Sequence, residues 1–255
     1  MINSKINAIA DMIIHSERVV FFTGAGVSTE SGIPDFRSPG GIWTKFDPED
    51  FTLEKYINDP KSRSKQWNLL IENGLLINAE PNRAHLALAE LDRLGKLQRI
   101  ITQNIDNLHQ KAGAPPEKVI ELHGTMSWAR CMDCGERFSI YSLLDEFRSG
   151  GKVPPCSICS GLIKPDVVFF GEALPKQALE ESVRWSRTSD LFIVIGSSLV
   201  VYPAALMPIY AKESGATLVI INNTCTNLDS EADIIANGSA GEVMEKILLR
   251  VKSGL

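Results

Sequence analysis

Short apolar runs alternate with helical stretches along most of this chain. Six runs are candidates for buried strands: residues 18–23, 97–102, 119–122, 167–170, 191–196 and 217–222. Apolar residues at helical spacing occur in other segments: residues 3–16, 85–94, 176–186 and 241–251. Strands that alternate with helices usually pair in parallel and are covered on both faces. The sequence therefore predicts an α/β fold built on a Rossmann-like, doubly wound parallel sheet.

The composition fits a globular chain with one large domain, or a medium domain that carries an insertion. The 255 residues are 44% hydrophobic, and 26 basic residues against 31 acidic ones give a net charge of -5. Negative charge does not favour binding to phosphate backbones, so nucleic acid is not expected as a primary partner. No apolar run approaches the ~18 residues of a membrane span, and charged residues interrupt the first helix. We expect a cytoplasmic protein without a membrane partner.

Four of the five cysteines form two Cys-x-x-Cys pairs, Cys131 with Cys134 and Cys156 with Cys159, and 21 residues lie between the pairs. This spacing is close to that of zinc ribbons, and it favours metal binding over a redox pair. Four thiolates complete a tetrahedral shell and leave no position for water, so we expect one structural Zn²⁺ ion. Cys225 stands apart, and we expect it to be a small buried apolar residue.

Two segments interrupt the alternation of strands and helices. Residues 38–80 are mixed and partly helical, and residues 126–164 contain the paired cysteines. We expect these segments to form a smaller lobe made of a helical module and a zinc-binding module. The Rossmann-like domain would then comprise residues 1–37, 81–125 and 165–255.

The first apolar run ends in a glycine turn, Gly24-Ala25-Gly26, with Ser28 just beyond it. Backbone without side chains can approach a pyrophosphate closely, and a helix that begins after the turn would direct free N–H groups at the anion. The fingerprint is incomplete, because Thr29 occupies the place of its third glycine. On these residues alone, a plain strand-to-helix turn remains an alternative.

The loop that follows contains Asp35, Phe36 and Arg37 in a proline-stiffened stretch that could close over a nicotinamide. The fourteen residues from Gly24 to Arg37 resemble the signature stretch of the sirtuins, which are NAD-dependent protein deacylases. The resemblance implies that this part of the chain binds NAD⁺ through the following residues: Gly24, Ala25, Gly26, Ser28, Asp35, Phe36 and Arg37.

A second polar stretch follows the run at residues 97–102. Gln103, Asn104 and Asp106 fall at the carboxyl end of the expected strand, where open α/β sheets bind ligands. The run at residues 119–122 ends at His123, and an imidazole can accept a proton near neutral pH. A lone histidine is more often structural than catalytic. The resemblance to sirtuins implies that His123 is the catalytic base and that Gln103, Asn104 and Asp106 line the nicotinamide and ribose pocket.

The other three histidines are interpreted as structural residues. His15 lies on a surface-like helix, His85 follows Asn82 at a helix start, and His109 falls in the turn after Asp106.

Two further stretches resemble the sirtuin substrate groove and the far side of the cofactor site. Residues 164–175 alone predict only a buried core strand, but the similar stretch in sirtuins binds the acyl-lysine peptide by strand addition. The implied substrate-binding residues are Val168, Phe169, Phe170, Gly171, Glu172 and Val201. The implied cofactor residues are Gly196, Ser197, Ser198, Asn222, Asn223 and Ala240. A helix cap is the alternative interpretation of Gly196 to Ser198.

These motifs occur in the sirtuin order over nearly the whole chain, and they imply an NAD-dependent protein lysine deacetylase. In the implied reaction the acyl-lysine amide oxygen attacks the nicotinamide ribose, nicotinamide leaves, and His123 deprotonates a ribose hydroxyl that attacks the imidate. The products are free lysine, nicotinamide and O-acetyl-ADP-ribose. NAD⁺ is the implied co-substrate, and acetylated proteins or peptides are the implied partners.

The acyl group and the reaction class have alternatives. Sirtuins that accept succinyl or malonyl lysine carry a tyrosine and an arginine where this chain has Trp67 and Leu70. An apolar pair offers an acyl carboxylate no partner, so acetyl or a longer apolar acyl group is favoured. Protein mono-ADP-ribosylation remains a close alternative. A dehydrogenase would need an acid after a second strand, but Asp47 follows prolines, and a zinc-ribbon binding protein would need a basic face.

Overall fold

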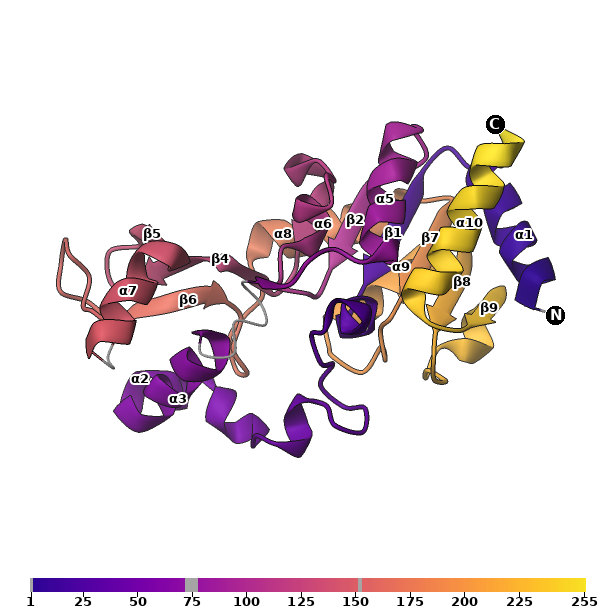
Figure 1. The fold of residues 1–255 in the computed structure, drawn as a ribbon. Helices are drawn as coiled ribbons and strands as arrows, with labels where there is room; N and C mark the ends of the chain where they lie inside the picture. Colours follow the sequence, from indigo (N-terminus) through magenta and orange to yellow (C-terminus); the bar gives the residue numbers. More distant parts are fainter. Residues whose placement is uncertain (1, 72–77, 151–152) are drawn as a thin grey trace.

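The computed structural model describes residues 2–71, 78–150 and 153–255. The chain forms a large and a small lobe side by side (Figure 1). The large lobe contains a six-stranded parallel sheet in the order β3-β2-β1-β7-β8-β9. Its strands are β1 (Val19–Thr23), β2 (Arg99–Thr102), β3 (Val119–Glu121), β7 (Leu191–Ile195), β8 (Thr217–Asn222) and β9 (Ile234–Asn237). This is the strand order of the doubly wound dinucleotide-binding fold, and it confirms the predicted fold class.

Helices cover both faces of the large sheet because its buried strands alternate their side chains between the two faces. Phe21 of β1 belongs to the apolar cluster under α1 (Ile2–His15), α5 (Arg83–Arg93) and α10 (Ala240–Gly254). Phe22 belongs to the cluster under α8 (Lys176–Thr188) and α9 (Met207–Glu213) on the other face. Within the described ranges, no helix is long and apolar enough to cross a membrane.

The small lobe is built on an antiparallel sheet in the order β5-β4-β6. Its strands are β4 (Gly124–Cys131), β5 (Arg137–Ser139) and β6 (Ile163–Val167), and its helices are α2 (Leu53–Asn58), α3 (Pro60–Ile71) and α7 (Ile140–Gly150). Tyr56 and Trp67 are fully buried in the apolar cluster that joins these elements. The Trp67 indole donates a 2.7 Å hydrogen bond to Tyr56 Oη, so two of the helices are fastened to the same core.

The prediction of a core strand at residues 167–170 is wrong. Strand β6 ends at Val167 and belongs to the antiparallel sheet of the small lobe, and Phe170 is 43% exposed. Periodicity also did not reveal β4, whose buried and exposed residues do not alternate regularly, because its register against β6 shifts between Gly124 and Ala129.

The prediction of a helix directly after the glycine turn is also wrong. Residues Ala25–Val27 and Thr29–Ser31 form two short 3₁₀ turns instead. Gly32 ends the second turn with φ of 85°, and Pro34 follows, so the chain cannot continue as an α-helix. The next α-helix is α2, which belongs to the small lobe.

Candidate active site

The glycine turn after β1 packs directly on the turn after β7. The Gly26 N–H donates a 2.8 Å hydrogen bond to the carbonyl oxygen of Gly196, which has φ of 62°. A Cβ atom on Gly26 would lie 2.8 Å from that oxygen, and one on Gly196 would lie 2.3 Å from the Val27 nitrogen. Glycine is therefore required at both positions for contact between the two backbones. The contact joins the carboxyl ends of neighbouring strands, where such sheets bind ligands.

A buried hydrogen-bond network lies behind this turn. Ser28 Oγ donates to Asp106 Oδ2 at 2.7 Å and accepts from Asn104 Nδ2 at 3.0 Å. Asn104 Nδ2 also lies 3.2 Å from the carbonyl oxygen of Gly24, and Asp106 Oδ1 accepts from the Leu108 N–H. All three side chains are buried and have partners. Three residues that are distant in the sequence are thus held in one fixed arrangement.

Two histidines that the sequence predicts to be structural, His85 and His109, extend this network. His85 Nε2 lies 3.5 Å from Ser28 Oγ, and the His85 and His109 rings are 4.9 Å apart. His109 Nε2 lies 2.9 Å from Thr23 Oγ1. Burial lowers the pKa of His85 to about 4 and that of His109 well below its usual range, so both rings are neutral at pH 7. The capping-box spacing between Asn82 and His85 was the one sequence signal for the placement of His85 at the start of α5.

His123 follows β3 and is oriented by two backbone contacts. Its Nδ1 atom lies 3.0 Å from the carbonyl oxygen of Gln103, and its own carbonyl oxygen accepts the Val168 N–H at 2.9 Å. A carbonyl can only accept, so Nδ1 carries the proton and Nε2 retains its lone pair. Burial lowers the pKa of His123, and the bond to Gln103 opposes this shift. The side chain is a neutral imidazole with one basic nitrogen.

Some of the other predicted cofactor residues are hydrogen-bonded near His123, and others contact only their own loop. Gln103 Nε2 donates to Ser197 Oγ at 2.8 Å, which links the ends of β2 and β7. The Asp35 carboxylate instead accepts from Ser38 Oγ and from the Arg37 and Ser38 N–H groups, so it stabilises its own loop. Phe36 packs against Trp43, with 5.1 Å between ring centroids.

The adenine-side candidates lie further along the sheet. Asn222 ends β8, and its Nδ2 atom donates to the carbonyl oxygen of Thr224 at 2.9 Å. Ser198 and Asn223 are exposed, and Ala240 is the buried first residue of α10. The structure therefore leaves four candidates outside the hydrogen-bonded centre: Ser198, Asn222, Asn223 and Ala240. It brings together eight predicted residues that follow β1, β2, β3 and β7: Gly26, Ser28, Gln103, Asn104, Asp106, His123, Gly196 and Ser197.

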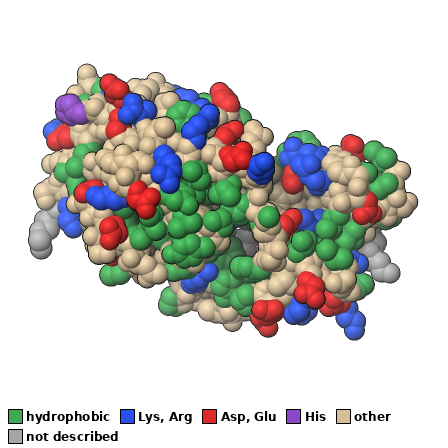
Figure 2. All heavy atoms as spheres, turned by 180° about the vertical axis from the view of Figure 1, so that it is seen from behind, with side chains coloured by type: hydrophobic (Ala, Val, Ile, Leu, Met, Phe, Trp, Pro, Cys, Tyr) green, Lys and Arg blue, Asp and Glu red, His purple; other side chains and the backbone are tan. Residues whose placement is uncertain are grey.

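The predicted substrate segment, residues 168–172, forms a turn beside His123. The Phe170 N–H donates to the carbonyl oxygen of Phe51, and the Phe170 carbonyl accepts the Leu53 N–H at 3.0 Å. Within the described part of the chain, the Gly171 N–H and the Val168 carbonyl have no hydrogen-bond partner. Figure 2 shows apolar side chains gathered along the hollowed junction of the two lobes. Val201, the other substrate candidate, is half-buried, and its carbonyl accepts the Ala205 N–H.

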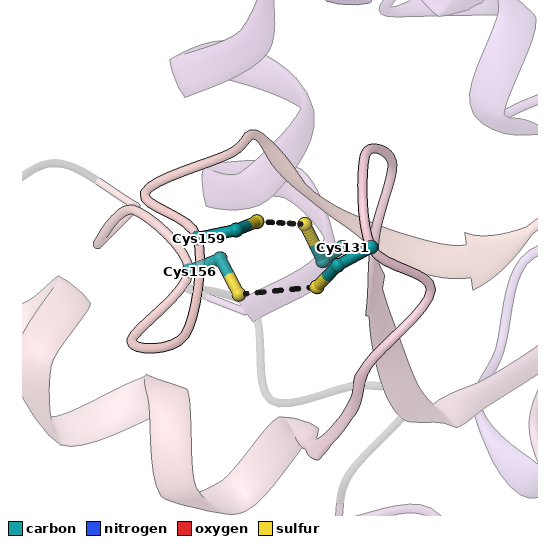
Figure 3. Close-up of side chains that lie close together, drawn as sticks. Cys131, Cys156 and Cys159 are labelled. Carbon is teal, nitrogen blue, oxygen red and sulfur yellow. Dashed lines mark hydrogen bonds between the residues drawn. The ribbon is translucent and has the colours of Figure 1, made fainter.

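The four paired cysteines meet between two loops of the small lobe (Figure 3). Their sulfur atoms all lie within 4.8 Å of one another, with Cys131 Sγ 3.4 Å from Cys159 Sγ and Cys134 Sγ 3.7 Å from Cys156 Sγ. Zinc with Zn–S bonds of about 2.3 Å needs sulfur atoms roughly 3.8 Å apart, so the cluster fits this metal. The Cys134 N–H contributes most to lowering the pKa of Cys131 to about 7, whereas the pKa values of Cys134 and Cys159 are raised, so one thiolate is favoured in the cluster before a cation binds.

The expectation that Cys225 is buried is wrong. This residue is exposed, because β8 ends at Asn222 and Cys225 lies in the loop beyond it.

The chain matches known proteins over most of its length. Residues 24–203 match the model of the Sir2 family. The NAD-dependent protein deacetylase 1 of Pyrobaculum aerophilum is 47% identical over 98% of this chain and 96% of the relative. A solved complex of Sir2 with a p53 peptide and NAD⁺ has a TM-score of 0.86 and 38% identity, and the match covers 97% of this chain and 98% of the other. A Sir2 variant with a deacetylated p53 peptide and 3'-O-acetyl-ADP-ribose has a TM-score of 0.88 and 39% identity, covering 95% and 96%.

Proposed function

This chain belongs to the Sir2 family, and we infer that it is an NAD-dependent protein lysine deacetylase that transfers the acetyl group of acetyl-lysine to ADP-ribose. The reaction releases nicotinamide and O-acetyl-ADP-ribose. The observation that carries the inference is the neutral His123, whose Nδ1 is bonded to the Gln103 carbonyl and whose Nε2 is free to accept a proton. This base stands at the ends of the strands that also position Ser28, Asn104 and Asp106.

His123 is proposed as the general base. NAD⁺, when bound, supplies an ADP-ribose acceptor and a nicotinamide leaving group. His123 Nε2 takes the proton of a ribose hydroxyl, and the positive charge that develops on the ring strengthens the bond from Nδ1 to the Gln103 carbonyl. The same bond holds the ring in one orientation, so the base needs no rotation before it acts.

We propose that Asn104 and Asp106 orient the nicotinamide ribose and carboxamide, and that Ser28 holds both side chains in place. The close contact of Gly26 with Gly196 leaves a backbone surface without side chains, which suits the phosphates. Ala25 adds to this surface. The proposed cover of the reactive ribose is the loop of Asp35, Phe36 and Arg37, and the proposed contacts on the ribose and adenine sides are Gln103, Ser197, Ser198, Asn222, Asn223 and Ala240.

We propose that an acetylated peptide binds by strand addition to residues 168–172, together with Val201. Among the residues that the structure describes, the Gly171 N–H and the Val168 carbonyl have no hydrogen-bond partner. This supports the proposal, because strand addition needs unused backbone groups. The exposed Phe170 side chain offers apolar surface beside them. Main-chain contacts discriminate little among side chains, so we expect a broad range of peptide sequences.

Cys131, Cys134, Cys156 and Cys159 would hold one structural Zn²⁺ ion. Four thiolates would complete its coordination, so the ion would stabilise the small lobe and take no part in the chemistry. Thiols that must stay reduced to bind a metal support the proposal of a cytoplasmic protein.

The test is nicotinamide release from NAD⁺ with an acetyl-lysine peptide, a succinyl-lysine peptide and no peptide, for the wild type and His123→Ala. We expect nicotinamide release that depends on the acetyl peptide and is accompanied by free lysine. Because His123 acts after nicotinamide leaves, steady-state formation of free lysine is the rate that should fall ~10²–10⁴-fold in the variant. Release together with ADP-ribose attached to protein would favour mono-ADP-ribosyl transfer instead. Intact NAD⁺ under every condition would contradict the deacetylase.

A further inference from the structure

Lys164 is a buried cation that plays no part in the proposed chemistry. It lies in β6, and only 10% of its side chain is exposed. Its Nζ atom donates to the carbonyl oxygens of Val167 at 2.6 Å and Pro165 at 3.1 Å, and to Glu172 Oε2 at 3.1 Å. An ammonium group has three donors, so every donor of Lys164 has a partner.

Glu172 completes the arrangement from the far end of the turn. Its Oε2 atom accepts both Lys164 Nζ and the Phe169 N–H, the latter at 3.0 Å. The Lys164 ammonium also lies 4.7 Å from the centre of the Phe169 ring. The ion pair therefore connects β6 to residue 172, across the turn formed by residues 168–172. It also contacts this turn through the N–H group and the ring of Phe169.

This closed turn contains the backbone groups proposed to bind the peptide. Of its five N–H groups, those of Val168, Phe169, Phe170 and Glu172 are bonded within the protein, and the Gly171 N–H has no partner in the described ranges. Because the Val168 N–H is bonded to the His123 carbonyl, the turn is also held at a fixed place relative to the proposed base.

We propose that Lys164 and Glu172 are positioning residues for the peptide substrate, whose ion pair holds residues 168–172 in the conformation that leaves Gly171 N–H and the Val168 carbonyl available. The proposal rests on the proposed function, because it assigns the ion pair to the peptide groove of that site. Neither charge needs to touch the substrate. Removal of Glu172 leaves the buried Lys164 ammonium without its counter-charge. Removal of Lys164 leaves the Glu172 carboxylate, whose side chain is 27% exposed, without the cation that holds it against the turn, so it can turn toward solvent and release the Phe169 N–H.

The experiment measures steady-state kinetics with the acetyl-lysine peptide and NAD⁺ varied separately, and peptide affinity by fluorescence anisotropy without NAD⁺. We expect Lys164→Met to raise the peptide KM and Kd about 10-fold, equivalent to about 1.4 kcal/mol, while kcat and the KM for NAD⁺ change less than ~3-fold. Lys164→Arg keeps the charge and should recover most of the peptide affinity. Lys212→Met is the matched control, because Lys212 makes a 2.6 Å ion pair with Asp233 and is assigned no role in either substrate site.

A fall in kcat with unchanged peptide KM and Kd would overturn the proposal. That result would mean only that a smaller fraction of the variant is folded. Glu172→Gln removes one charge at constant size. If Lys164→Met does not fold, the same rise in peptide KM and Kd is expected for Glu172→Gln. A wild type that binds acetyl peptide but releases no nicotinamide would contradict the deacetylase function, and the variants' Kd values would still test the positioning role.

Discussion

His123 Nδ1 is 3.0 Å from the carbonyl oxygen of Gln103. The two residues follow β3 and β2, which pair in parallel with Thr102 opposite Glu121. This register brings the chain beyond each strand to the same edge of the sheet. The position of the proposed base is thus determined by sheet pairing. The main-chain carbonyl of Gln103 determines which ring nitrogen carries the proton, and substitution of the Gln103 side chain would not remove this carbonyl.

The acid limb of the pH profile should lie lower than that of an ordinary histidine. Burial lowers the pKa of His123 from 6.5, so its basic form persists to lower pH. We expect kcat/KM for the acetyl peptide to fall only below pH 6.5, with an apparent pKa under that value. The measurement is the kcat/KM profile from pH 4.5 to 8, with enzyme stability checked at each pH. An apparent pKa above 6.5 would contradict the role of burial.

Ser28 and Asp106 should act as one unit. Their side chains share a 2.7 Å hydrogen bond, and Ser28 Oγ also accepts a hydrogen bond from Asn104 Nδ2. We expect Ser28→Ala and Asp106→Asn each to lower kcat/KM for NAD⁺ by roughly 10–100-fold, and the double variant to lose much less than the product of the two effects. Two effects that multiply in full would show that the residues act independently.

The two buried histidines should make stability depend on pH. The folded-state pKa of His85 is about 4, and that of His109 is also lowered, so the unfolded chain binds more protons as the pH falls below 6.5. The contribution of His85 to stability is complete above pH 6.5 and is lost between pH 6.5 and about 4, with a loss on the order of 2 kcal/mol at pH 5. The contribution of His109 is also complete above pH 6.5 and is lost as the pH falls below that value.

Urea unfolding at several pH values measures this loss. His85→Asn should reduce the pH dependence, whereas His15→Ala should not, because His15 lies at the exposed end of α1. Equal dependence in the wild type and His85→Asn would show that His85 does not titrate on unfolding.

Removal of zinc should unfold the small lobe first. The four sulfur atoms connect the end of β4, which contains Cys131, to the loop that contains Cys156, and both residues belong to the core of the lobe. We expect one zinc per chain, and a fall in Tm of roughly 10 °C on chelation or in Cys131→Ser. The control is Cys225→Ser, since Cys225 is exposed and lies outside the cluster. Full zinc content in Cys131→Ser would contradict this ligand set.

Trp67 should affect stability more than acyl selectivity. The acyl preference is predicted from Trp67 and Leu70, but the Trp67 side chain is fully buried and bonded to Tyr56. The Leu70 side chain lies outside the described part of the chain. We expect Trp67→Phe to lower the free energy of unfolding by about 1–3 kcal/mol and to leave the ratio of acetyl to succinyl turnover unchanged. A changed ratio would place Trp67 at the acyl site.

The sequence by itself determined five of the six parallel strands, the four-cysteine cluster and the polar residues that follow the strands. These features depend on local patterns: apolar runs, the Cys-x-x-Cys spacing, and the residues directly after a strand. β9 and the antiparallel β4 and β5 were not predicted, since short or half-exposed strands carry a weak pattern.

Only the tertiary structure decided which of these residues cooperate. His85 and Ser28 are 57 positions apart, and His123 and Gln103 are 20 apart, so they meet only when the sheet has assembled. Residues 167–170 were predicted as a strand because their apolar side chains give no sign that the chain turns there or that Lys164 pairs with Glu172. The sequence specifies which side chains are present, but their hydrogen bonds and burial depend on distances that arise only in the folded chain.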